Sequence, residues 1–447
     1  MRQKPLTLIV SDLHMGDGQA GDDFVDHNRQ FANFVDAQVR TEQGKKGDIE
    51  LIINGDFLEF VQVRPDLYTL NSQDYWCSEA ESLTKLESII EGHPQAFRAL
   101  ADFQKPGNVV TLFAGNHDVD LYWEGVRDRL RQVAGNLNIE LSSDTYTRYG
   151  GRLHISHGHL FPTIDTANGF SHWSNPVLRL PDDNAPPRLE MCPGTLFVAR
   201  FVNPLEAKYP FADNLHPETE LLRILWKEHR WGLLTVGWLG TRFLKQHFGA
   251  ALSTTSDKSD IGVQILDAIR LDPFFREKIA ELCNDLLGLS GMTADSVQDR
   301  YTSIDNVEQL LAALLAVDGT TDKWLDTIEL AKPATSAIGS AGGETLSIIE
   351  TGRIDVRAAC ATIARGKWKA GAEIVVLGHT HIPEQLDEDG RRYYNPGSWT
   401  RYVDDASSLK LSDLANELAY PYRLNYIRVE AVEGRLQSNF LCIESQP

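Results

Sequence analysis

The first part of the chain alternates between short apolar runs and segments with helical spacing. Apolar runs at 6–12, 49–56 and 108–118 have the length of strands, and each ends in polar residues. Helical spacing follows each of them, in FANFVDAQV from Phe31, in a stretch through about Phe103 and in LYWEGVRDRLRQV. NIELSS and RLHISHGH predict two further strands. The alternation predicts an α/β domain with polar clusters at the carboxyl ends of its strands.

The end of the chain repeats this pattern. A helix is predicted near 354–369, and the apolar strand AEIVVLGHTH follows it. A hairpin is predicted around DEDGRR, and NYIRVEAVEGRLQSNFLCI predicts two strands that turn at Glu433 and Gly434.

Between Leu160 and about Ser347 the pattern changes. Prolines crowd PDDNAPP, and ETELLRILWKEHRWGLLTVGWLGTRFL and FFREKIAELCNDLLGL have helical spacing. Because 447 residues exceed one ordinary core, we interpret 161–347 as a mainly α-helical insertion in a core formed by 1–160 and 348–447. WGLLTVGWLG, at about ten residues, is too short to span a bilayer, so a core helix is expected there.

Composition narrows the function classes. Hydrophobic residues make up 42% and charged residues 24%, as in an ordinary soluble globular protein. The net charge of -20 repels polyanions, which argues against nucleic acid as a partner, although a local basic groove stays open. The five cysteines contain no CxxC pair, and the N-terminal sequence lacks the pattern of a signal peptide. A reducing, cytoplasmic location is therefore expected, and the sequence gives no sign of a membrane partner or of the oligomeric state.

Five polar clusters follow predicted strands. They are Asp12 and His14 in SDLHMGDG, Asp56 in NGDFLE, Asn116, His117 and Asp118 in GNHD, His157 and His159 in SHGH, and His379 and His381 in GHTH. Any one has an ordinary explanation, such as a buried core histidine or a helix N-cap. Together they offer oxygen and nitrogen ligands without sulfur, the set for Mn, Fe, Zn or a similar divalent ion. There are more ligands than one ion needs, so two ions are expected.

This ordered series resembles the calcineurin-like metallophosphoesterase superfamily, over roughly residues 6–160 and 350–442. The resemblance implies an α/β (α+β) fold, a two-sheet β-sandwich flanked by helices, here with the large helical insertion. It also implies two divalent ions, with Mn²⁺ expected first and Fe, Zn, Ni or Co as alternatives. The implied ligands are Asp12, His14 and His381 for one ion, Asn116, His157 and His379 for the other, and Asp56 as the bridge.

The resemblance further implies that a metal-bridging hydroxide attacks phosphorus, and two ions about 3.5 to 4 Å apart would generate it at neutral pH. His117 would protonate the leaving alkoxide and Asp118 would orient His117, although Asp118 could also cap a helix from Val119. In HISHGH, only one of His154 and His157 is expected to face the site, and we choose His157. His159 is left as a substrate contact or a neighbour of the ligands. NPGSW at 395–399 is expected to support the site.

The expected function is hydrolysis of a phosphate ester or pyrophosphate of a small molecule, with the insertion as a lid or substrate-selecting cap. One alternative is a nuclease or phosphodiesterase acting on nucleic acid or a cyclic nucleotide. Another is a hydrolase like the UDP-2,3-diacylglucosamine pyrophosphatases, with the apolar stretch from Trp231 to Leu239 as an acyl-binding or membrane-facing surface. GNHD stands where that subfamily would have GNRD, which argues against it. A non-catalytic scaffold of the same fold is the last alternative, and the intact ligand set argues against it.

Overall fold

The computed structural model describes residues 3–19, 21–24, 27–63, 77–141, 146–161, 356–403 and 405–443, together with short pieces between 178 and 310. Most of the predicted helices in ETELLRILWKEHRWGLLTVGWLGTRFL and FFREKIAELCNDLLGL lie outside the described residues. The division into a core and an insertion at 161–347 therefore stays a prediction.

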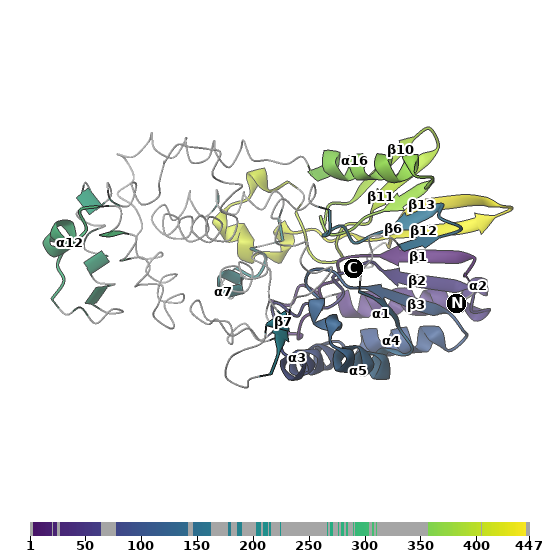
Figure 1. Ribbon diagram of the computed structural model, residues 1–447, viewed down its shortest axis with the longest axis horizontal. Helices are drawn as coiled ribbons and strands as arrows, with labels where there is room; N and C mark the ends of the chain where they lie inside the picture. The colour runs from purple at the N-terminus through teal and green to yellow at the C-terminus, as the bar shows by residue number, and fades with distance from the viewer. Residues whose placement is uncertain are drawn as a thin grey trace.

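Two mixed sheets form the centre of the described part (Figure 1). The first has the order β13 (Arg435–Ile443), β12 (Leu424–Val432), β1 (Leu6–Val10), β2 (Ile49–Ile53), β3 (Val109–Phe113) and β4 (Asn138–Glu140). The second has the order β10 (Glu384–Glu388), β11 (Arg391–Asn395), β9 (Ile374–Val376), β6 (Leu153–Ile155) and β5 (Tyr146–Arg148). A separate short pair consists of β7 (Leu178–Arg179) and β8 (Arg188–Leu189).

Strands β1, β2 and β3 are parallel neighbours, with Ile9 opposite Ile52 and Ile52 opposite Thr111. In the second sheet, β6 and β9 are also parallel. Parallel strands bring their carboxyl ends to one edge of a sheet, so the polar residues that follow these five strands can meet.

Helices cover the outer faces of both sheets. In Figure 1, α1 (Asn28–Arg40), α3 (Glu79–Gly92), α4 (Pro94–Gln104) and α5 (Glu124–Ala134) lie on one side, and α16 (Val356–Lys369) lies against the second sheet. The remaining described helices are α2 (Glu42–Lys45), α7 (Asn203–Glu206) and α12 (Ala294–Arg300), with 3-10 turns η3 (Val119–Tyr122), η6 (Ala406–Ser408), η7 (Leu411–Ala415) and η8 (Glu417–Ala419). Within this described part, no helix combines the length and apolarity that a bilayer crossing requires.

Local signals account for most of these boundaries. Helix α3 begins at a capping box formed by Ser78 and Glu81, and α4 begins with Pro94 at its first position. That proline divides the single helical stretch expected before Phe103 into α3 and α4. The predicted helix at 354–369 is confirmed as α16, and the predicted turn at Glu433 and Gly434 joins β12 to β13.

Two apolar cores hold the layers together. Between the sheets, Ile9, Ile52 and Phe113 of the first sheet pack with Ile155 and Val376 of the second. A larger core joins the other face of the first sheet to α1, α3, α4 and α5. The predicted two-sheet sandwich flanked by helices is therefore confirmed, and the ends of β1, β2, β3, β6 and β9 are fixed relative to one another by these two cores.

Candidate metal centre

The turns after the strands carry unusual backbone geometry. Five non-glycine residues in the predicted clusters have positive φ angles: Asp12 (55°), His14 (47°), Asp56 (47°), His379 (71°) and His381 (56°). This conformation is uncommon for residues with a Cβ and is maintained only where the surrounding fold imposes it. Its concentration in these turns indicates that the side-chain directions are set by the fold.

Glycines in the motifs make room for these side chains. A Cβ at Gly115 would collide with the carboxylate of Asp56, and a Cβ at Gly378 would collide with the side chains of Ser11 and Asp12. The glycine of GNHD therefore lets the turn after β3 approach the turn after β2, and the glycine of GHTH lets the two sheets approach closely at the site.

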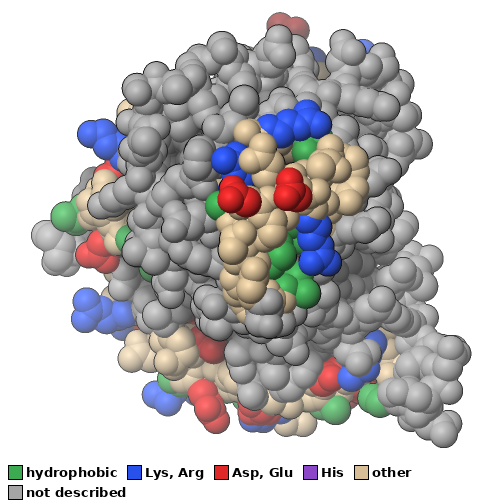
Figure 2. Space-filling model, turned by 90° about the vertical axis from the view of Figure 1, so that its left-hand side faces the viewer, with side chains coloured by type: hydrophobic (Ala, Val, Ile, Leu, Met, Phe, Trp, Pro, Cys, Tyr) green, Lys and Arg blue, Asp and Glu red, His purple; other side chains and the backbone are tan. Residues whose placement is uncertain are grey.

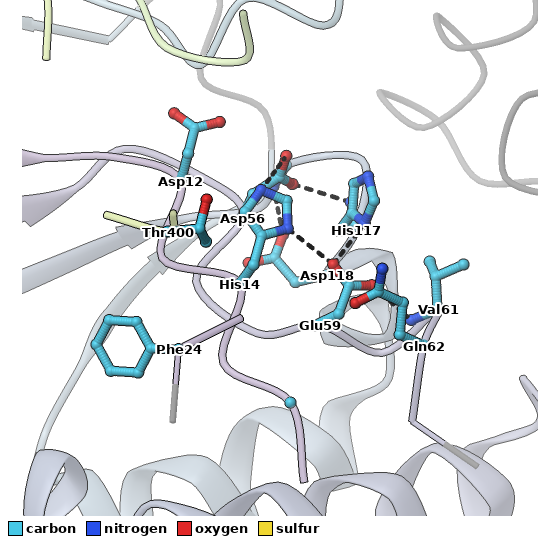
Figure 3. A network of polar contacts seen from close by, with 12 residues as sticks. Asp12, His14, Phe24, Asp56, Glu59, Val61, Gln62, His117, Asp118 and Thr400 are labelled. Atoms are coloured by element: carbon cyan, nitrogen blue, oxygen red, sulfur yellow. Dashed lines mark hydrogen bonds and ion pairs between the residues drawn. The ribbon is translucent and has the colours of Figure 1, made fainter. Parts of the chain in front are cut away.

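One group of ligand atoms comes from both sheets. Asp12, His14, Asp56 and His381 each place one ligand atom within 4.8 Å of the others. His381 Nε2 lies 3.0 Å from His14 Nε2 and 3.4 Å from Asp12 Oδ1, and His14 Nε2 lies 3.9 Å from Asp56 Oδ2. Figure 3 shows Asp12, His14 and Asp56 at the ends of their strands. These are the residues expected at the first ion, together with the expected bridge.

A second group shares Asp56 with the first. It contains Asp56, His157 and His379, and His157 Nε2 lies 3.1 Å from Asp56 Oδ2. The side-chain oxygen of Asn116 lies 3.3 Å from the same His157 nitrogen. The structure thus brings together all seven residues predicted as ligands, with Asp56 common to both groups. His154 belongs to neither group among the described residues: it lies in β6 opposite Val375.

In His14 and His157, Nδ1 contacts an oxygen of the protein, and this contact fixes the direction of Nε2. His14 Nδ1 lies 2.7 Å from Glu59 Oε2, and His157 Nδ1 lies 2.7 Å from the carbonyl oxygen of Asn54. Because a carbonyl only accepts, His157 Nδ1 carries a proton. Nε2 of each ring then points at the carboxylates, the arrangement typical of metal-ligating histidines. This donor set of imidazole nitrogen, carboxylate and amide oxygen fits divalent ions such as Mn²⁺ or Zn²⁺.

Electrostatics favour the ligand forms of several groups. Burial alone would raise the pKa of Asp56, but the nearby His157 outweighs it and lowers that pKa well below its usual range. Burial and His157 lower the pKa of His379 to about 3, so this imidazole is neutral. Burial opposes a proton on His157, yet Asp56 outweighs it and raises the pKa of His157 to about 9. An ion at this position would displace that proton.

Glu59 is a functional residue that the sequence interpretation missed. Its Oε2 lies 2.7 Å from His14 Nδ1 and also 2.7 Å from His117 Nδ1, as the dashed lines in Figure 3 show. Burial alone would raise the pKa of Glu59, but the two imidazoles outweigh it and hold the pKa at about 2. The available signal was an acidic residue inside the apolar run FLEFV, three residues after Asp56.

Asp118 does not have the position expected of it. Its carboxylate accepts hydrogen bonds from the backbone N–H groups of Gly115 and Phe57, and Nδ1 of His117 is occupied by Glu59. Burial, together with the neighbouring Asp56, raises the pKa of Asp118 to about 7. Nor does its side chain cap the turn that begins at Val119. Asp118 therefore joins the turn after β3 to the turn after β2.

His117 and His159 lie beside the ligand groups. The His117 side chain is 18% exposed, and its backbone N–H donates to Asp56 Oδ1 at 2.9 Å. His159 is buried, with its ring centre 5.2 Å from that of His157. Burial and His157 lower the pKa of His159 well below its usual range. No described residue bonds its Nδ1, and its predicted role as a substrate contact stays a prediction.

The NPGSW segment supports the site from the second sheet. The Ser398 hydroxyl and the backbone N–H of Trp399 both donate to the carbonyl oxygen of Asp12, at 2.8 Å and 3.0 Å. The Asn395 side chain donates to the carbonyl oxygen of Gly378 at 3.2 Å. The segment thereby ties the turn after β1 to the turn after β9, as expected.

A family model overlaps the motifs of the C-terminal part of the chain. The family model described as a calcineurin-like phosphoesterase superfamily domain matches residues 275–417, which include His379, His381 and the NPGSW segment. Among solved structures, wild-type Vps29 of Entamoeba histolytica in complex with zinc is 19% identical, with a TM-score of 0.12, over 19% of this chain and 46% of that one. A single mutant of the same protein is 19% identical, with a TM-score of 0.12, over 20% of this chain and 47% of that one. This chain thus spans slightly less than half the length of those two proteins. No curated protein matches the sequence.

Proposed function

We propose that the chain is a metal-dependent hydrolase of a phosphate ester or pyrophosphate bond in a small molecule, in line with the match of residues 275–417 to the calcineurin-like phosphoesterase family model. The observation that carries this proposal is the position of Asp56. Its carboxylate belongs to two adjacent groups of ligand atoms, because Oδ2 lies 3.9 Å from His14 Nε2 and 3.1 Å from His157 Nε2. Paired sites of this kind are typical of enzymes that cleave phosphate esters.

Two divalent ions, Mn²⁺ first among the alternatives, would be held by the residues of these groups. Asp12, His14 and His381 would bind one ion, Asn116, His157 and His379 the other, and Asp56 both. When bound, such ions neutralise phosphate charge and lower the pKa of a water toward about 7.

The residues of the chain itself handle the leaving group. His117, His379 and His381 are the partly exposed members of the cluster, and the side chains of His117 and His381 are 18% and 21% exposed, so a substrate would approach from their side. Glu59 Oε2 lies 2.7 Å from His117 Nδ1 and would stabilise a protonated His117 ring, whose Nε2–H would give its proton to the departing oxygen and leave a neutral imidazole. Asp118 fixes the turn that presents His117, through its bonds to Gly115 and Phe57.

The net charge of -20 supports a small substrate over nucleic acid. At the end of the molecule seen in Figure 2, the described surface around α12 carries both acidic and basic side chains. The four described cysteines are free, which supports a cytoplasmic location.

The test compares the Mn²⁺-loaded protein with Asp56→Asn and His117→Ala on mono-nitrophenyl and bis-nitrophenyl phosphate. We expect cleavage of at least one ester, loss of cleavage in both variants and loss on adding a chelator. Asp102→Asn serves as a matched control, since Asp102 forms an exposed pair with Lys105. A metal-loaded protein that is inert on both esters and on nucleotide and lipid pyrophosphates would overturn the proposal, and the ester preferred by an active protein defines the substrate class.

A further inference from the structure

Described pieces of the insertion contact both sides of the metal centre. On one side, α7 (Asn203–Glu206) lies against Val61 and Gln62, just after Glu59. On the other side, Leu215 pairs with Val403, in the segment that follows Trp399. These residues are therefore attached beside Glu59 and to the segment whose Ser398 and Trp399 bond the carbonyl oxygen of Asp12.

The contacts of α7 are polar and buried. The side-chain amide of Asn203 donates to the carbonyl oxygen of Val61 at 3.0 Å. The side-chain amide of Gln62 donates to both carboxylate oxygens of Glu206, at 3.2 Å and 3.0 Å. Asn203 is only 3% exposed and Glu206 only 5%. A buried carboxylate and amide cost more free energy than apolar side chains would, so simple packing does not explain their use here.

These contacts lead directly to His117. The peptide group of Val61 is held on both sides, because its carbonyl oxygen accepts from Asn203 and its N–H donates to Glu59 Oε1 at 3.1 Å. The other oxygen of Glu59 contacts His14 and His117. Figure 3 shows Val61 and Gln62 beside Glu59, with His117 on its far side.

We propose that Asn203 and Glu206 are positioning residues: they hold residues 61 and 62 so that the Glu59 carboxylate keeps His117 oriented toward the leaving group. Through these contacts the insertion sets the efficiency of proton delivery. This inference rests on the proposed function, in which His117 gives a proton to the departing oxygen. It differs from a lid role, because it predicts an effect that depends on the leaving group.

The first test is kinetic. The test compares wild type and His117→Ala with three variants of the insertion, Asn203→Ala, Glu206→Ala and Glu206→Gln. Each protein is assayed on a nitrophenyl ester and on the matching phenyl ester. The phenyl leaving group is more basic, so its departure depends more on a proton from the enzyme. We expect both alanine variants to lower kcat on the phenyl ester about tenfold more than on the nitrophenyl ester, a fraction of the roughly 100-fold or larger effect of losing a general acid. KM and bound metal should not change, and Glu206→Gln, which keeps one acceptor oxygen, should recover most of the rate. Glu87→Ala, at a partly exposed pair with Arg129, is the control.

The second test does not need activity. In the metal-loaded protein, the Nδ1–H proton of His117 should be visible by NMR because Glu59 protects it from exchange. We expect this signal to broaden in Asn203→Ala and in Gln62→Ala, which removes only the side chain facing Glu206, and to persist in Glu87→Ala. Thermal melting identifies any variant that fails to fold.

The outcomes separate the two claims. If His117→Ala changes the ratio of phenyl to nitrophenyl rates but the insertion variants leave both the ratio and the NMR signal unchanged, the positioning role is wrong and the hydrolase proposal stands. If the wild type is inert, the hydrolase proposal fails, and an Nδ1–H signal unaffected by Asn203→Ala then overturns the coupling as well.

Discussion

Replacing Glu59 with glutamine tests the geometry of the site at its most connected point. Three nitrogens contact the Glu59 carboxylate: Nδ1 of His14 and Nδ1 of His117 at 2.7 Å each, and the backbone N–H of Val61, which donates at 3.1 Å. A glutamine has one acceptor oxygen, and its NH₂ group would face at least one of these donors. Each buried donor left without a partner costs about 1–3 kcal/mol.

We therefore expect Glu59→Gln to lower the free energy of unfolding by about 2–4 kcal/mol. The kcat should fall roughly 10- to 100-fold, as is common when a partner of a metal ligand is removed. The assays are urea denaturation of the metal-free protein, and steady-state hydrolysis of the preferred nitrophenyl ester with bound metal measured by elemental analysis. Glu87→Gln, at the partly exposed pair with Arg129, should match wild type in both.

Asp118→Asn tests the competing hypothesis that Asp118 orients His117, which the sequence alone favoured. If Glu59→Gln keeps its rate within about threefold of wild type while fully metallated Asp118→Asn loses more than about tenfold, the assignment of Glu59 would be refuted.

Three other predictions concern the metals and the surrounding fold. Removing the ions with a chelator should abolish hydrolysis and lower Tm, because ions at about 100 times their Kd stabilise the folded state by about 2.7 kcal/mol. Adding Mn²⁺ back should restore both activity and Tm. A Tm that calorimetry finds unchanged would contradict metal binding at this site. Glu50→Gln should lower the free energy of unfolding by about 3 kcal/mol, because buried Glu50 pairs with Arg148 at 2.6 Å. It should leave kcat unchanged, because Glu50 lies at the amino-terminal end of β2, away from the ligand residues. Denaturation and activity measured on the same variant check both expectations. Burial alone would raise the pKa of Glu81, but hydrogen bonds from Arg188 and Ser78 outweigh it and lower that pKa below 4.5. The pair of Glu81 and Arg188 should therefore stabilise the protein fully above about pH 4.5 and progressively less as the pH falls further. The Tm difference between wild type and Arg188→Met should shrink between pH 6 and pH 3, and a difference that grows would show the sign to be wrong.

Much of the core could be predicted from the sequence because its signals are local. The runs at 6–12, 49–56 and 108–118 are short and mainly apolar, and each ends in its polar cluster, two or three residues after the strands end at Val10, Ile53 and Phe113. The end of each run predicts which residues form the turn at the carboxyl end of the strand. They also account for the seven ligand residues being found together, since parallel neighbours place those turns side by side.

The roles of Glu59 and Asp118 could not be predicted in this way, because they depend on how turns fold back on one another. Asp118 follows His117 in sequence, but its carboxylate turns toward the amides of Gly115 and Phe57. Glu59 is 45 residues from His14 along the chain, and contacts it only once β1 and β2 are paired. Adjacency in sequence favoured Asp118, and tertiary structure selects Glu59.

The distribution of ligands between the sheets adds a physical consequence. Asp12, Asp56 and Asn116 follow strands of the first sheet, whereas His157 and His379 follow strands of the second. No segment of the chain can assemble the site alone, so the ligands meet only after the apolar residues between the sheets have packed. Ions held by both sheets would in turn oppose their separation, because binding to the folded state alone stabilises it. Metal affinity and packing between the sheets should therefore change together, and substitutions that loosen that core should weaken metal binding without touching a ligand.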